Sequence, residues 1–381
     1  MPIVCSQGDQ NRRKNAPAGF RALAILGTFL LAAAAPTLAE HTRWWRQNSF
    51  EDFDKGTAKG IALRSDGKLF LAPRFAEVAD ANLAYLLALR ADGKGNLYAA
   101  GGSNAKVIRV DASGKSTTVF QSQELSAQAL AVDSGGNLYV GTSPDGKVYK
   151  VTAEGNSSVF FDPKTKYIWD LAVDKDGTVY VATGDTGKIF AVAPDGTGYV
   201  FYSGGETHIR SLALDSNGNL LAGTDPSGLV LRISKGANPR PFVLYETSKK
   251  EITSLLPDSN GDLYVAAVGE KSSVPQRMPT AQPTIIAPAQ SFSVTIGPAG
   301  NTVSGTPQAQ PGQFLPFPTV NSSSVYRVAA DGSPEEIWSS RDEVVYSLGL
   351  LPSGKLLFGT GNKGAVYELE GQDVYSLLVN A

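Results

Sequence analysis

A motif of 22 residues occurs three times in this chain, and each copy begins 41 residues after the previous one. The copies are LAVDSGGNLYVGTSPDGKVYKV at 130–151, LAVDKDGTVYVATGDTGKIFAV at 171–192 and LALDSNGNLLAGTDPSGLVLRI at 212–233. Self-similarity at a fixed period is typical of repeat architectures, in which one unit cannot bury its apolar faces alone. The chain is therefore expected to fold as a series of similar units that cover one another.

Each copy contains four short apolar runs that are separated by turn residues. In the copy that starts at Ala129 the runs are ALAVD, NLYVGT, KVYKV and SSVFF, and the segments DSGG, SPDG and AEGN separate them. Runs rich in Val, Tyr and Phe that are bounded by Gly, Asp and Asn are typical of strands joined by tight turns. The sequence therefore predicts an all-β propeller of four-stranded antiparallel blades.

The blades can be counted from the residue that starts each second strand. Seven positions of this kind occur, namely Lys68, Asn96, Asn137, Thr178, Asn219, Asp262 and Lys355. They predict seven blades, with six or eight as alternatives, and the short step of 28 residues after Lys68 indicates an incomplete first unit. The segment WWRQNSFEDF (44–53) is expected to close the ring by pairing with the last blade, and DVYSLLV (373–379) competes for that position.

The first 39 residues have the composition of a secretory signal peptide. A basic stretch that contains QNRRKN precedes the apolar run ALAILGTFLLAAAAP (22–36), and the small-residue segment TLA ends at Ala39. Because the run is too short to span a membrane, we expect cleavage after Ala39, with an uncleaved anchor as the alternative. The chain from 40 to 381 is then one propeller domain without a membrane span, located in the periplasm or outside the cell.

A second change of composition occurs in the last third of the chain. The stretch from about 269 to 323 contains nine prolines and is rich in Gln, Thr and Ser. It separates the second and third strands of the sixth counted unit, and it lacks the apolar content that a core requires. We expect a flexible loop here, which is either a tolerated insertion or an arm that contacts a partner.

Composition excludes several kinds of chemistry. The formal net charge of −2 gives no reason to expect nucleic acid as a partner. The single cysteine, Cys5, lies in the signal peptide, so the mature chain has neither a disulfide nor a thiolate. Only His208 lies in the folded body, since His41 is next to the cleavage site, and a zinc site of several histidines is therefore excluded. No cofactor is expected, and calcium, which oxygen ligands suffice to bind, is the one metal left open.

One aspartate recurs at the end of the first strand of successive repeats: Asp92, Asp133, Asp174, Asp215 and Asp258. A ring of metal-binding carboxylates is one interpretation of this pattern. Aspartate side chains in tight turns commonly accept hydrogen bonds from nearby backbone N–H groups. We therefore expect these residues to stabilise turns.

The residues that lead into each innermost strand vary between the copies, while the rest of the repeat does not. In a propeller these positions, together with the loops between the second and third strands, gather at one mouth of the central channel. The candidate ligand-binding residues are Tyr85, Tyr167, Trp169, Asp185, His208, Arg210, Asp225, Glu251 and Tyr346. Aromatic rings combined with charged groups are typical of binding surfaces, whereas an ordinary water-filled channel is the alternative interpretation.

The blade motif resembles that of NHL-type repeats. LAVDSGGNLYVGT and its copies are also similar to the blades of the regucalcin/gluconolactonase group and to the sensor propellers of bacterial two-component regulators. This resemblance covers about Gly60 to Val379. It implies the propeller fold, and it does not imply one activity, because unrelated functions share a fold.

Three functions follow as hypotheses. The first is an exported binding or scaffold module, without enzymatic activity, that recognises a protein, peptide or glycan partner at the channel mouth. The second is a calcium-dependent lactonase or lyase of the regucalcin–gluconolactonase kind. The third is the sensor component of an envelope complex. In each case the protein is expected to be a monomer.

Overall fold

The computed structural model describes residues 46–102, 104–236, 239–271, 322–361 and 363–380. The chain divides into two compact units, 1–47 and 48–381, and the fold described below is that of the second unit. The predicted signal peptide and most of the predicted proline-rich loop lie outside the described residues. In the described part of the chain, no helix has the length and apolarity that a membrane span requires.

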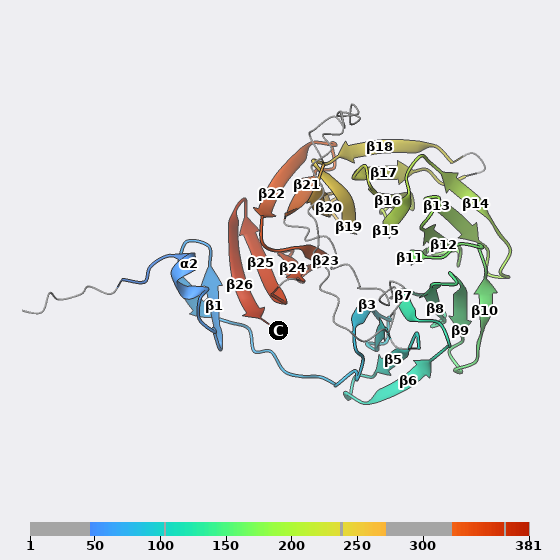
Figure 1. Cartoon of the computed structure of the whole chain (residues 1–381), viewed down its shortest axis with the longest axis horizontal. Coiled ribbons are helices and arrows are strands. Elements are labelled where there is room, and N and C mark those ends of the chain that lie inside the picture. Colours follow the sequence, from blue (N-terminus) through green and yellow to red (C-terminus); the bar gives the residue numbers. More distant parts are fainter. Residues whose placement is uncertain (1–45, 103, 237–238, 272–321, 362, 381) are drawn as a thin grey trace, which may run out of the picture. The chain divides into compact units, whose positions relative to one another are not determined.

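The second unit is a β-propeller of six antiparallel blades, in which the chain runs from the innermost to the outermost strand of each blade (Figure 1). Blade 1 consists of β3 (Leu86–Ala91), β4 (Leu97–Gly101), β5 (Val107–Val110) and β6 (Ser116–Phe120). Blade 2 consists of β7 (Ser126–Val132), β8 (Leu138–Ser143), β9 (Val148–Val151) and β10 (Ser157–Phe161). Blade 3 consists of β11 (Ile168–Val173), β12 (Val179–Thr183), β13 (Lys188–Val192) and β14 (Gly198–Ser203).

The remaining three blades follow the same order. Blade 4 consists of β15 (His208–Leu214), β16 (Leu220–Asp225), β17 (Leu229–Ile233) and β18 (Pro241–Glu246). Blade 5 consists of β19 (Lys249–Pro257), β20 (Leu263–Glu270), β21 (Ser323–Val328) and β22 (Pro334–Ser340). Blade 6 consists of β23 (Val345–Leu350), β24 (Leu356–Thr360), β25 (Ala365–Gly371) and β26 (Val374–Asn380).

The prediction of seven blades was wrong, because the unit counted from Lys68 forms a hairpin and not a blade. Its strands β1 (Ile61–Arg64) and β2 (Leu69–Leu71) pair with each other. Strand β1 then joins the outer edge of blade 6, where Leu63 lies opposite Leu377 on β26. The unit has no third or fourth strand of its own, as the short step of 28 residues to the next unit requires.

The prediction that the segment 44–53 supplies a closing strand was also wrong. Its described part forms the short helix α2 (Phe50–Phe53). Ser49 is the N-cap of this helix, and its hydroxyl accepts a hydrogen bond from the backbone of Asp52 while the Asp52 carboxylate accepts one from Ser49. This reciprocal capping box favours a helical turn over a strand. The C-terminal segment forms the outermost strand of blade 6 instead.

The recurring aspartates stabilise turns, as predicted. Asp133 accepts hydrogen bonds from the backbone N–H of Asn137 (2.8 Å), from its side-chain amide (2.8 Å) and from the hydroxyl of Tyr139 (3.2 Å). Asp92 and Asp215 hold their own asparagine partners in the same way. These bonds fix the hairpin between the first two strands of a blade, which sets where each innermost strand begins and ends.

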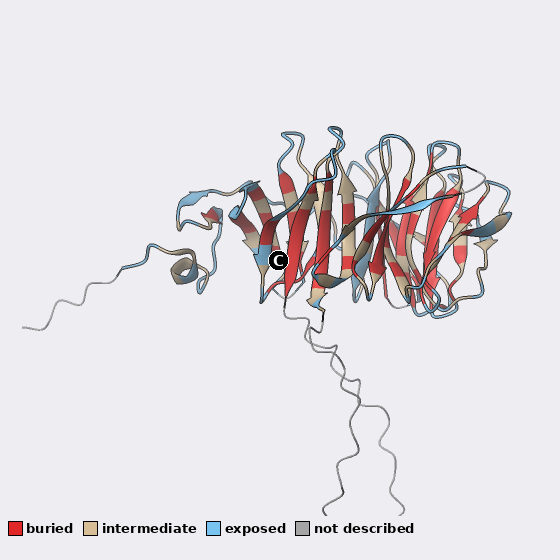
Figure 2. Cartoon of the chain, turned by 90° about the horizontal axis from the view of Figure 1, so that it is seen from above, coloured by how far each residue is buried: buried red, intermediate tan, exposed pale blue. Residues whose placement is uncertain are grey.

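The hydrophobic core lies between the blades. Five clusters of buried apolar side chains each join two consecutive blades, from the pair of blades 1 and 2 to the pair of blades 5 and 6. Figure 2 shows the buried residues along the strands and the exposed residues mainly in the loops at both ends of the strands. The loops at the strand ends are thus free to carry variable side chains on a rigid frame.

Candidate binding site at the channel mouth

Each of the six innermost strands contains one residue that is displaced from the regular pairing with its neighbour. The interruptions lie between Leu86 and Ala88 in blade 1 and at equivalent places in the other five blades. The displaced residues are Leu87, Gln128, Trp169, Arg210, Thr253 and Tyr346. A β-bulge leaves the extra residue unpaired and redirects its side chain. All six residues line one cavity of about 750 Å³ that the innermost strands surround.

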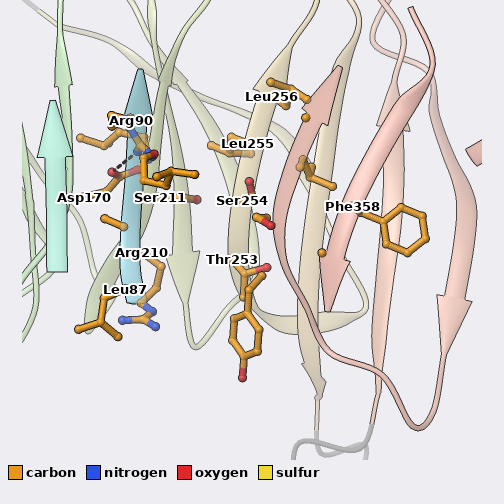
Figure 3. Close-up of a pocket in the computed structure, with 18 of the residues that line it drawn as sticks. Leu87, Arg90, Asp170, Arg210, Ser211, Thr253, Ser254, Leu255, Leu256 and Phe358 are labelled. Carbon is orange, nitrogen blue, oxygen red and sulfur yellow. Dashed lines mark hydrogen bonds and ion pairs between the residues drawn. The ribbon is translucent and has the colours of Figure 1, made fainter. Parts of the chain in front are cut away.

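The cavity therefore has a ring of six side chains, one from each blade, at equivalent positions of the fold. Figure 3 shows three of them, Leu87, Arg210 and Thr253, at a similar level of the cavity wall. Arg90 and Asp170 lie further along the strands in the same view. The ring contains apolar, amide, aromatic, cationic and hydroxyl groups. The fold therefore does not require one residue type at these positions.

Trp169 is the most constrained member of the ring. The ring of Tyr167 stacks against it with a centroid separation of 5.0 Å and an interplanar angle of 12°. The guanidinium carbon of Arg210 lies 3.8 Å from the centre of its ring, which is a close cation–π contact. Its indole N–H donates a hydrogen bond of 3.1 Å to Nδ1 of His208. The indole is thus packed between neighbours and is not a free platform for a ligand.

A close backbone approach makes the contact between Trp169 and His208 possible. Gly184 follows β12, and a Cβ atom added at this position would lie 2.7 Å from the indole nitrogen of Trp169. The same atom would lie 2.8 Å from Nδ1 of His208. Real side chains do not tolerate such distances, so only glycine leaves room for this hydrogen bond.

Arg210 is held from two sides by residues of the neighbouring blades. Its Nε atom donates a hydrogen bond of 2.6 Å to Glu251 of blade 5, while Trp169 of blade 3 lies against its guanidinium. The side chains of Arg210 and Glu251 retain 25% and 24% exposure, so the pair is half-buried. Within the described part of the chain, no hydrogen bond engages the two Nη atoms of Arg210. The outer edge of the guanidinium is therefore available to hydrogen-bond acceptors on a ligand.

Two further predicted residues lie next to this pair. Asp225 is directly opposite His208 in the ladder of blade 4. Burial raises the pKa of Asp225, and the nearby carboxylate of Glu251 raises it further. Tyr346 lines the cavity and is 57% exposed, and its pKa is raised by burial and by the Glu251 carboxylate. Tyr346 thus presents an exposed aromatic ring at the same cavity that Arg210 lines.

The structure brings most of the predicted site residues together. Contacts join Tyr167, Trp169, His208, Arg210, Asp225 and Glu251. Tyr346 lines the same cavity as Trp169 and Arg210. Tyr85 is 71% exposed, and it is not among the residues that line the cavity. Asp185 lies in the turn after β12 with a positive φ of 66°, and it is not among the residues that line the cavity.

Sequence reasoning missed Asp170, a largely buried carboxylate that lines the cavity and whose side chain is 14% exposed. Its carboxylate accepts the backbone N–H groups of Leu171 and Leu212, each at 2.9 Å. It also forms an ion pair of 3.1 Å with Arg90 of blade 1. Burial raises its pKa, which the charge of Arg90 partly offsets. The signal was present in the sequence, because the equivalent positions of the other blades hold only alanine or serine.

The remaining ring members were also missed. Leu87, Gln128 and Thr253 occupy bulge positions, but none of them is an aromatic or charged residue of the kind that predicts a binding mouth. Thr253 donates a hydrogen bond of 2.7 Å to the carbonyl of Val345, so it ties blade 5 to blade 6. Among the described residues, no group of three or more His, Cys, Asp and Glu side chains is arranged to hold a metal ion.

Comparisons with known proteins identify the fold. No protein-family model matches the sequence, and no curated protein matches it either. Among solved structures, virginiamycin B lyase from Staphylococcus aureus is 10% identical with a TM-score of 0.55, over 76% of this chain and 82% of that one. A streptogramin B lyase structure is 12% identical with a TM-score of 0.48, over 84% and 86% of the two chains.

A gluconolactonase from Xanthomonas campestris is 11% identical with a TM-score of 0.46, over 74% of this chain and 82% of that one. Structural similarity at such low identity bears on the fold alone and not on activity, because one fold hosts many functions. Together with the six blades, the similarity to virginiamycin B lyase shows that this chain is a β-propeller protein.

Proposed function

We propose that this chain is an exported binding module that holds part of a protein, peptide or glycan partner at its channel mouth. The observation that carries the proposal is the fixed position of Arg210 between Trp169 and Glu251. Three consecutive blades contribute to this arrangement, although the blades need none of these side chains for their cores. Such an arrangement supports a role in recognition.

The geometry favours a ligand that is rich in hydrogen-bond acceptors. The free Nη edge of Arg210 provides donors in a planar fork, and the exposed ring of Tyr346 provides an apolar surface. Because the guanidinium is already held in place, ligand binding costs less side-chain entropy here than it would at an unrestrained arginine. Peptide carbonyl groups and sugar hydroxyls both match this chemistry.

The test is a binding screen with two kinds of probe, an array of defined oligosaccharides and a library of random peptides. Arg210→Lys keeps the charge but loses the planar fork, and Tyr346→Ala removes the exposed ring. Arg232→Lys is the matched control, because Arg232 also lies over an aromatic ring, that of Phe242, on the outer strands of blade 4. We expect each site variant to weaken the selected probes by about tenfold or more, as the loss of a binding anchor does, and the control to bind as the wild type does.

Equal binding by Arg210→Lys, Tyr346→Ala and the wild type would contradict the proposal. A calcium-dependent lactonase or lyase activity is the second candidate, favoured by the propeller similarity to virginiamycin B lyase. Turnover of a lactone or of virginiamycin B that requires added calcium and stops with a chelator would replace the binding proposal by this one.

A further inference from the structure

In the residues that the structure describes, the ring of blades lacks one apolar interface. The innermost strands of consecutive blades contact each other from β3 to β23, and each pair of consecutive blades shares one of the five apolar clusters. Among the described residues, no such cluster joins blade 6 to blade 1. The free face of blade 1 is partly covered by the linker that precedes β3, since Ala79, Ala81 and Leu83 pack against it.

The uncovered part of this missing interface is an apolar slot. We use the term slot for the opening between blades 6 and 1, with Leu89 on one wall and Leu357 and Val366 on the other. These three residues line the same cavity as the ring of bulged residues, so the cavity extends between the two blades. Leu89 is 50% exposed, although the equivalent faces of the other blades are buried in the interblade clusters. Contiguous exposed apolar surface is characteristic of interaction sites in soluble proteins.

The same chain also carries an apolar hairpin, β1–β2, whose character matches that of the slot. The hairpin β1–β2 has the sequence IALRSDGKLFL, which follows the pattern of the two innermost strands of a blade. It lies on the outermost edge of blade 6 instead. Because side chains alternate along a strand, β2 presents Phe70 on one face and Leu69 and Leu71 on the other. All three are exposed, Leu71 by 90%, so both faces of the hairpin are apolar, as those of an element between two blades must be.

We propose that this chain forms an isologous dimer in which the hairpin β1–β2 of each copy inserts into the slot of the other. A protruding apolar hairpin and an apolar slot flank the same blade, which makes this surface self-complementary about a two-fold axis. Ten of the eighteen large apolar residues that are exposed in the described part of the chain lie between 61 and 89. The proposed dimer differs from the monomer that the sequence led us to expect.

A second copy fits the slot better than the chain's own hairpin does. Leu63 of the hairpin is 2% exposed and packs in the cluster shared by blades 5 and 6. Arg64 forms an ion pair of 3.4 Å with Glu370 of β25. Just before the hairpin, Asp54 forms an ion pair of 3.0 Å with Lys363. These contacts hold the hairpin on its own blade 6 and leave β2 to face a neighbouring molecule.

The experiment measures the mass of the purified chain by light scattering across a range of concentrations. We expect twice the monomer mass for the wild type at about 0.1 mM, a concentration at which micromolar interfaces are occupied. The hairpin variant Phe70→Lys/Leu71→Glu and the slot variant Leu89→Glu are each expected to be monomeric. Val159→Glu is the matched control, an exposed apolar residue on the outer strand β10, and it is expected to remain dimeric.

Mixing the two monomeric variants gives a more specific outcome. The intact hairpin of the slot variant can still enter the intact slot of the hairpin variant, so one of the two contacts returns. We therefore expect a heterodimer from the mixture and monomers from each variant alone, with cooperative thermal unfolding throughout. A wild type that stays monomeric at about 0.1 mM overturns the proposal, and so does dimerisation that survives in both variants. If the wild type is monomeric and the slot residues are nevertheless shielded from solvent, the chain's own hairpin fills the slot. That result also overturns the proposal.

Discussion

The guanidinium of Arg210 lies 3.8 Å from the centre of the Trp169 ring, and the two residues occupy equivalent bulges of consecutive blades. Neither residue takes part in the regular pairing of its strand at this point. Their contact therefore depends on where the bulges direct the two side chains. It gives the channel mouth a fixed cation without the help of a bound ligand.

Gly184→Ala tests the close packing around Trp169. The added methyl group would lie within 3 Å of both the indole nitrogen and Nδ1 of His208, so the hydrogen bond between them has to break. We expect the indole N–H resonance of Trp169 to shift in NMR spectra and probe binding to weaken. Gly205→Ala is the control, because nothing lies within 4 Å of a Cβ atom there. An unchanged Trp169 resonance in Gly184→Ala would contradict the described packing.

Asp225→Asn is expected to raise the thermal unfolding midpoint at neutral pH. Burial and the neighbouring carboxylate of Glu251 raise the pKa of Asp225 in the native state above its value in the unfolded state. At a pH between these two pKa values, the native state therefore binds more protons than the unfolded state. The free energy of unfolding falls over that range, and the charged form therefore costs stability at neutral pH. The advantage of the asparagine variant should shrink as the pH is lowered toward the ordinary pKa of aspartate, which differential scanning calorimetry at several pH values would show.

Asp195→Asn is the control of opposite sign. The backbone N–H of Thr197 donates to Asp195 at 2.8 Å and lowers its pKa. The charged form therefore contributes stability above the ordinary pKa of aspartate, and this contribution is lost as the pH falls through the lowered value. We expect the asparagine variant to unfold at a slightly lower temperature at neutral pH. The same direction of change in both variants would argue against the electrostatic account.

Asp170→Ala is expected to destabilise the fold by about 1–3 kcal/mol, because it leaves the backbone N–H of Leu212 and the charge of Arg90 without their acceptor. The control is Ser254→Ala, which changes the equivalent position of blade 5. Urea unfolding of both variants gives the two free energies. Equal losses would show that the carboxylate has no special role in joining blades 3 and 4.

Phe358→Ala is expected to cost about 3–5 kcal/mol, as removal of a buried aromatic ring generally does. The ring is 1% exposed and lies 4.7 Å from the ring of Trp338 and 5.2 Å from that of Tyr367. Tyr346→Ala in the adjacent strand should cost much less, because its ring is mainly exposed. The comparison by urea unfolding separates the core of blade 6 from its channel face, and similar losses would place Tyr346 in the core.

The blade pattern could be predicted from sequence because it depends on local rules. Alternating apolar runs and the Asp–Asn turn contacts involve residues a few positions apart, and the structure has the strands and turns where the motif places them. The number of blades could not be predicted in this way. The hairpin around Lys68 follows the same local pattern as an inner strand pair, and only its pairing with β26, more than 300 residues away, shows that it is not part of a blade.

The candidate site could be predicted in part. The variation before the innermost strands pointed to Trp169, Arg210 and Tyr346 because their side chains differ from the repeat. The bulges that direct them into the cavity have no sequence signature, and Thr253 was missed for that reason. The contact of Gly184 with two side chains from different blades is a tertiary feature that a single sequence does not reveal.

The one bulge in each innermost strand has a consequence for how this protein can change. A bulged residue lies outside the ladder and outside the interblade clusters, so its exchange leaves the blade cores unchanged, although Trp169, Arg210 and Thr253 also contact residues of neighbouring blades. Six such positions, one per blade, point into a shared space while the frame around them stays constant. New ligand preferences can therefore arise from substitutions at single, separate codons. A library randomised at these six positions should yield many folded proteins with different ligands.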